Sequence, residues 1–146
     1  MNLQLSEIAN RVKNKNIAVV GLGPMGRNHA RMLSASNNVV GCDVKEENHD
    51  ASLVCYKDVS KLLSEKDIDV AVISTPGPSH FNIAKTLIEE GIDSIIIEKP
   101  LSTSVAKCEI LQELAKKHNT KIVVNHSRRW DRNFVNLANF VKEGTL

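Results

Sequence analysis

The chain has 146 residues, a net charge of +2, 42% hydrophobic residues and 25% charged residues. These values are typical of one globular domain that can bury a core of its own. No apolar run approaches membrane-spanning length, and no basic stripe with interleaved aromatic residues indicates a nucleic-acid partner. We therefore expect a globular domain that binds neither a membrane nor nucleic acid.

The cysteines indicate a reducing compartment. There are three of them, without close spacing, which is typical of neither a disulfide framework nor a zinc site. Cys42 and Cys55 lie in apolar, strand-like segments, where they are predicted to be buried. No set of His, Cys and carboxylate residues has the spacing of a metal site. We expect a cytoplasmic protein without a bound metal.

The first predicted elements enclose a glycine-rich turn. A short helix is expected within residues 1–15, and an apolar strand follows at residues 17–20. A further helix is predicted at residues 27–33. Between the strand and this helix lie three glycines with the spacing G-x-G-x-x-G: Gly21, Gly23 and Gly26.

A strand, a glycine turn and a helix in this order are typical of a cradle for the pyrophosphate of a dinucleotide. Gly21 would permit the tight turn, Gly23 would let backbone approach the phosphates, and Gly26 would let the helix pack closely on its strand. The phosphates would lie at the helix N-terminus, where free N–H groups favour negative charge. The alternative for the triplet alone is a structural turn in some other α/β protein.

Strands and helices alternate along the rest of the chain. Further strands are predicted at residues 39–43, 53–56, 68–74, 92–97 and 121–125. Further helices are predicted to end at residues 63, 90, 117 and 142, with Asp58 capping the first and Ser102, Thr103 or Ser104 capping the third. This alternation predicts a Rossmann-type α/β fold, a doubly wound parallel sheet with right-handed crossovers.

Polar clusters directly follow five of the predicted strands. They are residues 21–26, Asp43, residues 75–80, residues 98–100 and residues 126–129. Because the carboxyl ends of parallel strands meet at one edge of a sheet, we expect these clusters to form one site beside the topological switch.

Asp43 is a candidate for binding the adenosine ribose. It ends the second strand, 22 positions after Gly21, close to the expected spacing of about 20. A carboxylate there accepts hydrogen bonds from the ribose hydroxyls and repels a 2′-phosphate, which favours NAD over NADP. Lys45 could soften that repulsion, so NADP stays possible. The alternative is an ordinary aspartate that caps a turn.

Lys99 is the candidate catalytic residue. It follows a buried strand within the sequence IIIEKP, where an ammonium group can polarise a carbonyl or lower the pKa of a substrate hydroxyl. Pro100 restricts Lys99 to extended geometry, which helps to aim the side chain. Glu98 can pair with Lys99 or contact the cofactor. The alternative is a solvated ion pair at a strand end.

Four motifs in order, GLGPMG, VISTPGPSH, EKPLS and NHSRRWD, resemble the Gfo/Idh/MocA oxidoreductases, a family that includes inositol dehydrogenases and glucose–fructose oxidoreductases. The resemblance covers the chain from Ile17 onward, and RRWD is most similar to the inositol-dehydrogenase branch. It implies hydride transfer between NAD, or possibly NADP, and a sugar, inositol or similar polyol.

The resemblance also implies a role for each matching residue. The pyrophosphate turn would comprise Gly21, Gly23, Pro24, Met25 and Gly26. Asp43 would bind ribose, and Lys99 would lie near nicotinamide and substrate, with Arg128 near the substrate pocket. The remaining cofactor-binding residues would be Ser74, Thr75, Pro76, His80 and Glu98. Gly77 departs from the asparagine common after the proline, and His80 has the alternative role of satisfying backbone groups.

Family members are about twice as long, and a second α/β domain supplies their substrate pocket, oligomer interface and remaining catalytic groups. We therefore expect residues 1–146 to be the dinucleotide-binding domain, with residues 143–146 starting a linker to a domain that is absent here. Alone, the chain should bind NAD weakly and turn over little substrate, whereas the full-length form would be a homo-oligomer. The alternatives are a stand-alone redox-sensing module and a nucleotide- or CoA-binding domain.

Overall fold

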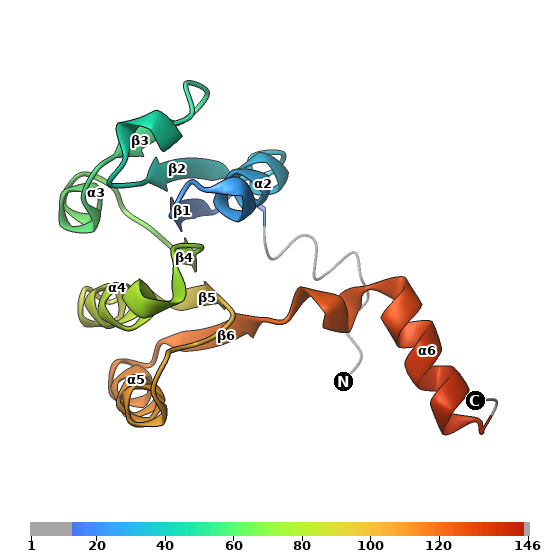
Figure 1. Cartoon of the computed structure of the whole chain (residues 1–146). Helices are drawn as coiled ribbons and strands as arrows, with labels where there is room; N and C mark the ends of the chain where they lie inside the picture. Colours follow the sequence, from blue (N-terminus) through green and yellow to red (C-terminus); the bar gives the residue numbers. More distant parts are fainter. Residues whose placement is uncertain (1–12, 145–146) are drawn as a thin grey trace.

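The computed structural model describes residues 13–144 and contains one six-stranded sheet (Figure 1). The strands are β1 (Asn16–Val20), β2 (Asn38–Cys42), β3 (Val54–Tyr56), β4 (Val70–Ile73), β5 (Ser94–Glu98) and β6 (Lys121–Asn125). All neighbours are parallel, in the order β3-β2-β1-β4-β5-β6. The order reverses between β1 and β4, which is the arrangement of a doubly wound dinucleotide-binding sheet. The predicted Rossmann-type fold is confirmed.

Helices lie on both faces of this sheet (Figure 1). They are α2 (Pro24–Leu33), α3 (Val59–Glu65), α4 (Gly77–Glu89), α5 (Val105–His118) and α6 (Arg132–Lys142), with 3₁₀ turns η1 (Glu46–Asn48) and η2 (Ser127–Trp130). In Figure 1, α2 lies on one face, α3, α4 and α5 lie on the other, and α6 extends away from the sheet. No helix in the described part of the chain is long and apolar enough to cross a bilayer.

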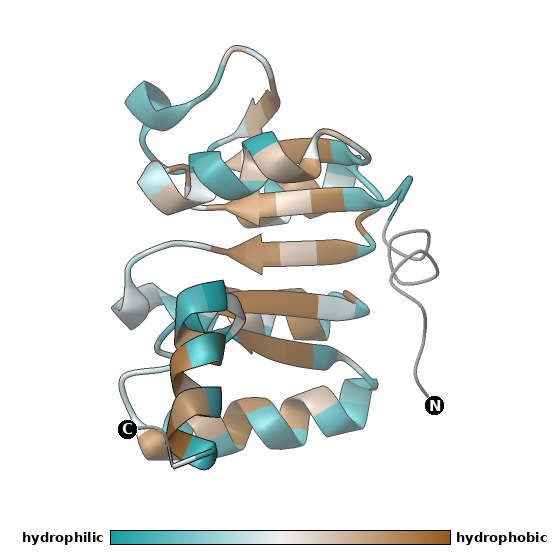
Figure 2. Cartoon of the chain, turned by 90° about the vertical axis from the view of Figure 1, so that its right-hand side faces the viewer, coloured by the Kyte–Doolittle hydropathy of each residue, from teal (hydrophilic) through white to brown (hydrophobic). Residues whose placement is uncertain are grey.

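The core has two parts, one on each face of the sheet. The smaller part, under α2, includes Val19, Leu22, Ala30 and Val72, all at most 2% exposed. The larger part lies under α3, α4 and α5 and includes Leu62, Leu87, Ile95, Ile97 and Leu111, all fully buried. Figure 2 shows the strands as almost continuously hydrophobic, as expected for parallel strands that are covered on both faces.

The cysteines are free thiols, and the prediction that they are buried holds best for Cys42. Burial, followed by the nearby charges of Asp58 and Asp43, raises the pKa of the Cys42 thiol to about 12. Cys55 is half-buried and packs beside the smaller part of the core. Cys42 thus behaves as a small apolar residue rather than as a reactive thiol.

Element boundaries differ from the predicted ones mainly at helix starts. Helix α2 begins at Pro24 rather than at residue 27, and α4 begins at Gly77 rather than at residue 79. Each helix has a proline in its first positions, where its missing N–H and fixed φ are tolerated. The predicted leading helix lies outside the described residues, apart from residues 13–15, which are not helical.

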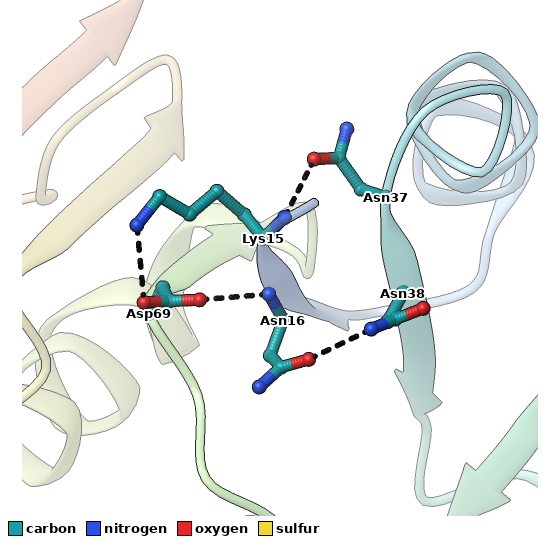
Figure 3. A network of polar contacts seen from close by, with 5 residues as sticks. All are labelled: Lys15, Asn16, Asn37, Asn38 and Asp69. Carbon is teal, nitrogen blue, oxygen red and sulfur yellow. Dashed lines mark hydrogen bonds and ion pairs between the residues drawn. The ribbon is translucent and has the colours of Figure 1, made fainter. Parts of the chain in front are cut away.

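Polar contacts tie the strands together at the amino edge of the sheet (Figure 3). The Asp69 carboxylate accepts a hydrogen bond from Asn16 N at 2.8 Å and pairs with Lys15 Nζ at 3.3 Å. Lys15 N donates to Asn37 Oδ1, and Asn38 Nδ2 donates to Asn16 Oδ1, both at 3.1 Å. These bonds align the starts of β1, β2 and β4. The polar side chains at this edge therefore stabilise the sheet.

Two neighbouring residues of α5, one buried and one exposed, test whether this helix packs against the sheet. Leu111 is fully buried, whereas its neighbour Ile110 is 51% exposed. We expect Leu111→Ala to lower the free energy of unfolding by about 2–5 kcal/mol, because it removes buried surface and leaves a cavity. Ile110→Ala should change it by less than about 0.5 kcal/mol. Urea unfolding measures both, and equal losses would contradict the placement of α5 against the sheet.

Candidate active site at the carboxyl edge of the sheet

The glycine turn after β1 is packed so closely that two of its glycines cannot be replaced. Gly21 has φ of +91°, and a Cβ there would lie 2.7 Å from Thr75 N. A Cβ on Gly26 would lie only 1.7 Å from Gly21 O. Gly23 is different, because nothing lies within 4 Å of its Cβ position. Gly21 and Gly26 are therefore required by packing, while Gly23 leaves open space above the turn.

The N-terminus of α2 opens onto this space. Gly23 is the N-cap and has no side chain to cap the helix, and Pro24 has no N–H. Arg27 N donates to Gly23 O at 2.9 Å, so the N–H groups of Met25 and Gly26 precede the first intrahelical bond. Free N–H groups at the positive end of a helix dipole form a site for an anion such as a pyrophosphate.

Asp43 lies directly after β2 and contacts the glycine turn. Its Oδ2 accepts hydrogen bonds from Leu22 N at 2.8 Å and Asn48 Nδ2 at 3.1 Å, and its Oδ1 accepts one from Lys45 N at 2.9 Å. Burial by itself raises the pKa of Asp43, but the bonds from Lys45, Leu22 and Asn48 outweigh it and lower the pKa below 3.8. The carboxylate is thus charged and held beside the turn.

Ser74 and Thr75 follow β4 and lie against the same turn. The Thr75 methyl group would lie 2.8 Å from a Cβ on Gly21, and Ser74 Cβ 3.5 Å from one on Gly26. Thr75 Oγ1 accepts a hydrogen bond from Ser79 Oγ at 2.7 Å. Ser74 Oγ is buried without a hydrogen-bond partner. An unsatisfied buried hydroxyl beside an open glycine turn fits a site that a polar ligand completes.

Glu98 does not pair with the Lys99 side chain. Its Oε1 accepts hydrogen bonds from His29 on α2 at 2.9 Å and from Asn125 at the end of β6 at 2.7 Å. Burial raises the pKa of Glu98, but the bonds from His29 and Asn125 outweigh this effect and hold it below its ordinary value. The carboxylate therefore joins α2, β5 and β6 at the carboxyl edge.

Lys99 is exposed, and no ion pair of its ammonium group occurs within residues 13–144. The peptide bond between Lys99 and Pro100 is cis. His80 is 1% exposed, with Nδ1 at 2.7 Å from Pro100 O and Nε2 at 2.7 Å from Thr75 O. Both ring nitrogens of His80 face backbone carbonyls, which favours its alternative role of satisfying backbone groups.

Arg128 contacts α6. It is exposed in η2, and its guanidinium lies 5.2 Å from the centre of the Phe134 ring on α6. This cation–π contact holds η2 against the start of α6.

Sequence reasoning missed four side chains around these residues: His29, Asn48, His49 and Asn125. His49 Nε2 lies 2.8 Å from Asp43 O, so His49 and Asn48 close the loop around Asp43. Asn125 pairs in register with Glu98, and the rule that strand ends share an edge could have identified it. His29 has no such signal, because its partner lies 69 positions away.

Comparison with known proteins agrees with this geometry. Residues 15–126 match the model of the oxidoreductase family with an NAD-binding Rossmann fold, GFO_IDH_MocA. The chain belongs to this family. It is an NAD-binding oxidoreductase domain, as the resemblance in its motifs predicted.

The chain is similar to individual dehydrogenases and to an NAD-binding protein of known structure. Inositol 2-dehydrogenase of Salmonella paratyphi B is 28% identical over 88% of this chain and 41% of its own length. An NADP⁺-dependent scyllo-inositol 2-dehydrogenase of Bacillus subtilis is 26% identical over 71% of this chain and 28% of its own. The crystal structure of an NAD-binding protein from Listeria innocua superposes with a TM-score of 0.81 at 27% identity, covering 91% of this chain and 41% of that one. The chain thus spans about two fifths of the length of the Salmonella and Listeria relatives.

The glycine turn yields a paired prediction on stability. We expect Gly26→Ala to lower the free energy of unfolding by at least about 3 kcal/mol, because the new Cβ collides with backbone. Gly23→Ala should change it by no more than about 1 kcal/mol, since φ there is −62° and the space is open. Urea unfolding of both variants tests this, and a stable Gly26→Ala variant would contradict the close approach of α2.

Asp43 yields a prediction on pH dependence. A carboxylate whose pKa is lowered by folding contributes stability above its ordinary value of 3.8, and that contribution is lost as the pH falls below it. We expect Asp43→Asn to cost about 1–2 kcal/mol at pH 7, because charge-assisted bonds become neutral ones. The difference from the native chain should disappear as the pH falls below 3.8.

The control for this measurement is Asp67→Asn, at an exposed aspartate. Its effect on the free energy of unfolding should stay within about 0.5 kcal/mol at every pH. Denaturant unfolding between pH 7 and pH 3 follows both variants. A difference for Asp43→Asn that does not change with pH would show that its charge contributes nothing.

Proposed function

We propose that this domain serves a dehydrogenase that transfers hydride between NAD and a carbon of a sugar, inositol or similar polyol. The observation that carries the proposal is the exposed Lys99 ammonium at the carboxyl end of β5. This strand neighbours β4, whose end packs against the glycine turn. The names of relatives that are inositol dehydrogenases support the substrate class.

The residues divide the proposed cofactor site into two halves. Gly21, Gly23, Pro24, Met25 and Gly26 would hold the pyrophosphate, with Asp43 binding the adenosine ribose. Ser74, Thr75 and Pro76 would line the nicotinamide ribose, because they follow the strand next to β1. The buried, unsatisfied hydroxyl of Ser74 supports a polar ligand at this position.

Bound NAD would supply the acceptor for hydride, and the domain's own residues would prepare the substrate oxygen. As a base from the rest of the catalytic group removes the proton of the substrate hydroxyl, the Lys99 ammonium would donate a hydrogen bond to that oxygen and stabilise the oxyanion that develops. Glu98 would remain with His29 and Asn125, so its charge would not neutralise Lys99. Arg128, which lies over the Phe134 ring, would contact the substrate from η2.

Asp43 supports a preference for NAD over NADP, because a lowered pKa keeps it charged and a charged carboxylate repels a 2′-phosphate. The three free cysteines support a reducing, cytoplasmic location. Lys99 weighs against a redox-sensing module that performs no chemistry, since such a module would have no use for an ammonium group at the nicotinamide.

Binding measurements on the chain test the proposal. In calorimetry, we expect the chain to bind NADH more tightly than NADPH. Added CoA should leave the affinity for NADH unchanged. Gly23→Ala should weaken NADH binding by at least about tenfold, because its methyl group enters the space of the pyrophosphate. Ile110→Ala, on the far side of the sheet, is the control and should bind normally. Alone, the chain should oxidise myo-inositol negligibly.

Two results would contradict the proposal. A chain that binds neither NADH nor NADPH would exclude the cofactor site. Tight CoA binding that Gly23→Ala abolishes would instead favour the alternative of a nucleotide-binding domain with the same topology.

A further inference from the structure

His80 connects the two loops that form the nicotinamide half of the proposed site. It lies in the first turn of α4 and is 1% exposed. Its Nε2 lies 2.7 Å from Thr75 O, directly after β4, and its Nδ1 lies 2.7 Å from Pro100 O, directly after β5. One buried imidazole thus bridges the ends of two neighbouring strands.

The ring of His80 can act only as the donor in this bridge. A carbonyl oxygen accepts hydrogen bonds and does not donate them, so the proton of each hydrogen bond comes from the imidazole. Both carbonyl oxygens lie within hydrogen-bond distance of the ring, at 2.7 Å. The two ring contacts that the structure records are to backbone carbonyls, and neither is to a carboxylate. The imidazole is thus enclosed between the two loops.

Other residues in the first turn of α4 also contact these two loops. Ser79 Oγ donates to Thr75 Oγ1 and to Pro76 O, both at 2.7 Å. On the other side, a Cβ at Gly77 would lie 3.4 Å from Pro100 Cδ, in ordinary contact. Gly77 and Pro100 therefore lie side by side at the helix start, where the Pro100 carbonyl reaches His80.

We propose that His80 is a positioning residue, whose buried ring lies between Thr75 O and Pro100 O and fixes the Thr75 loop and the Lys99–Pro100 turn relative to each other. It does not contact the ligand. Through Pro100 it sets the position of the Lys99 side chain, and through Thr75 it sets the loop beside the nicotinamide ribose. This inference rests on the proposed function, because it assigns the two loops to the nicotinamide half of NAD.

The adenosine half depends on other contacts. Asp43 is held by Leu22, Lys45 and Asn48, and none of these bonds involves α4. Ser74 N also donates to Val20 O at 2.7 Å, which holds the start of the loop to β1 independently of His80. Loss of the His80 bridge should therefore affect the nicotinamide half and leave the adenosine half in place.

A comparison of two ligands tests this separation. NADH and ADP-ribose share the adenosine and pyrophosphate groups, but only NADH has the nicotinamide ring. We expect His80→Gln to weaken NADH binding by about tenfold, because the two nicotinamide-side loops lose the side chain that joins them, and ADP-ribose binding by less than about twofold. His118→Gln, at an exposed histidine at the end of α5, should change neither affinity.

Hydrogen exchange followed by NMR of the native chain gives an independent readout, which does not depend on whether His80→Gln folds. The ring N–H of His80 should exchange with solvent more slowly than the ring N–H of exposed His118, because the His80 ring is buried and faces backbone carbonyls. Equal exchange rates for the two rings would overturn the proposed bridge.

The binding outcomes separate this inference from the proposed function. Unchanged NADH affinity in a folded His80→Gln variant would overturn the positioning role and leave the proposed function intact. Equal losses for NADH and ADP-ribose would also overturn it, because they would indicate a general structural role. Failure of the native chain to bind either ligand would overturn the proposed function, and this inference with it.

Discussion

The close approach of α2 to the turn after β1 is the constraint on which the rest of the site depends. It exists because Gly26 has no Cβ to collide with Gly21 O, and because Gly21 has none to collide with Thr75 N. The first contact brings the helix N-terminus to the sheet edge. The second lets the loop after β4 close against the turn. One pair of missing methyl groups therefore positions both segments of the proposed cofactor site, the start of α2 and the loop after β4.

Two carboxylates at this edge are held by donors within the domain. Asp43 is bonded by the glycine turn and its own loop, and Glu98 by His29 and Asn125. In both cases burial alone would favour the neutral acid, and hydrogen bonds reverse that preference. Because the hydrogen-bond donors to both carboxylates are already in place, the surrounding side chains need to rearrange little when a ligand binds beside these charges. The bond from His29 also links Glu98 at the end of β5 to α2, so this contact joins the two halves of the proposed cofactor site.

The sequence predicted the fold well because apolar runs and helical spacing are local signals. The six strands lie where they were predicted, to within two residues, and Asp58 caps α3 with a bond to Lys61 N. The helix starts at Pro24 and Gly77 were missed because prolines and glycines are typical of turns as well as of first helical positions.

The polar partners within the site were harder to predict. Glu98 and Lys99 are adjacent in the sequence, and adjacency suggested an ion pair. The partners of Glu98 come instead from positions 29 and 125, and the carbonyls that His80 bridges belong to residues 75 and 100. Such pairings depend on how strand ends converge in space, and neither composition nor periodicity encodes them. Only the rule that parallel strands share a carboxyl edge pointed to the right neighbourhood.

The separation of Glu98 from Lys99 follows from the geometry of a strand. Successive side chains point to opposite faces, so Glu98 lies on the same side as Ile96, which packs toward the core under α2. His29 reaches Glu98 from that side and satisfies its charge. Lys99 comes after the last residue of β5, where the chain leaves the sheet. Two opposite charges next to each other in sequence are thereby kept from neutralising each other. The anion stabilises the scaffold, and the cation remains exposed, as its proposed role toward a substrate oxygen requires.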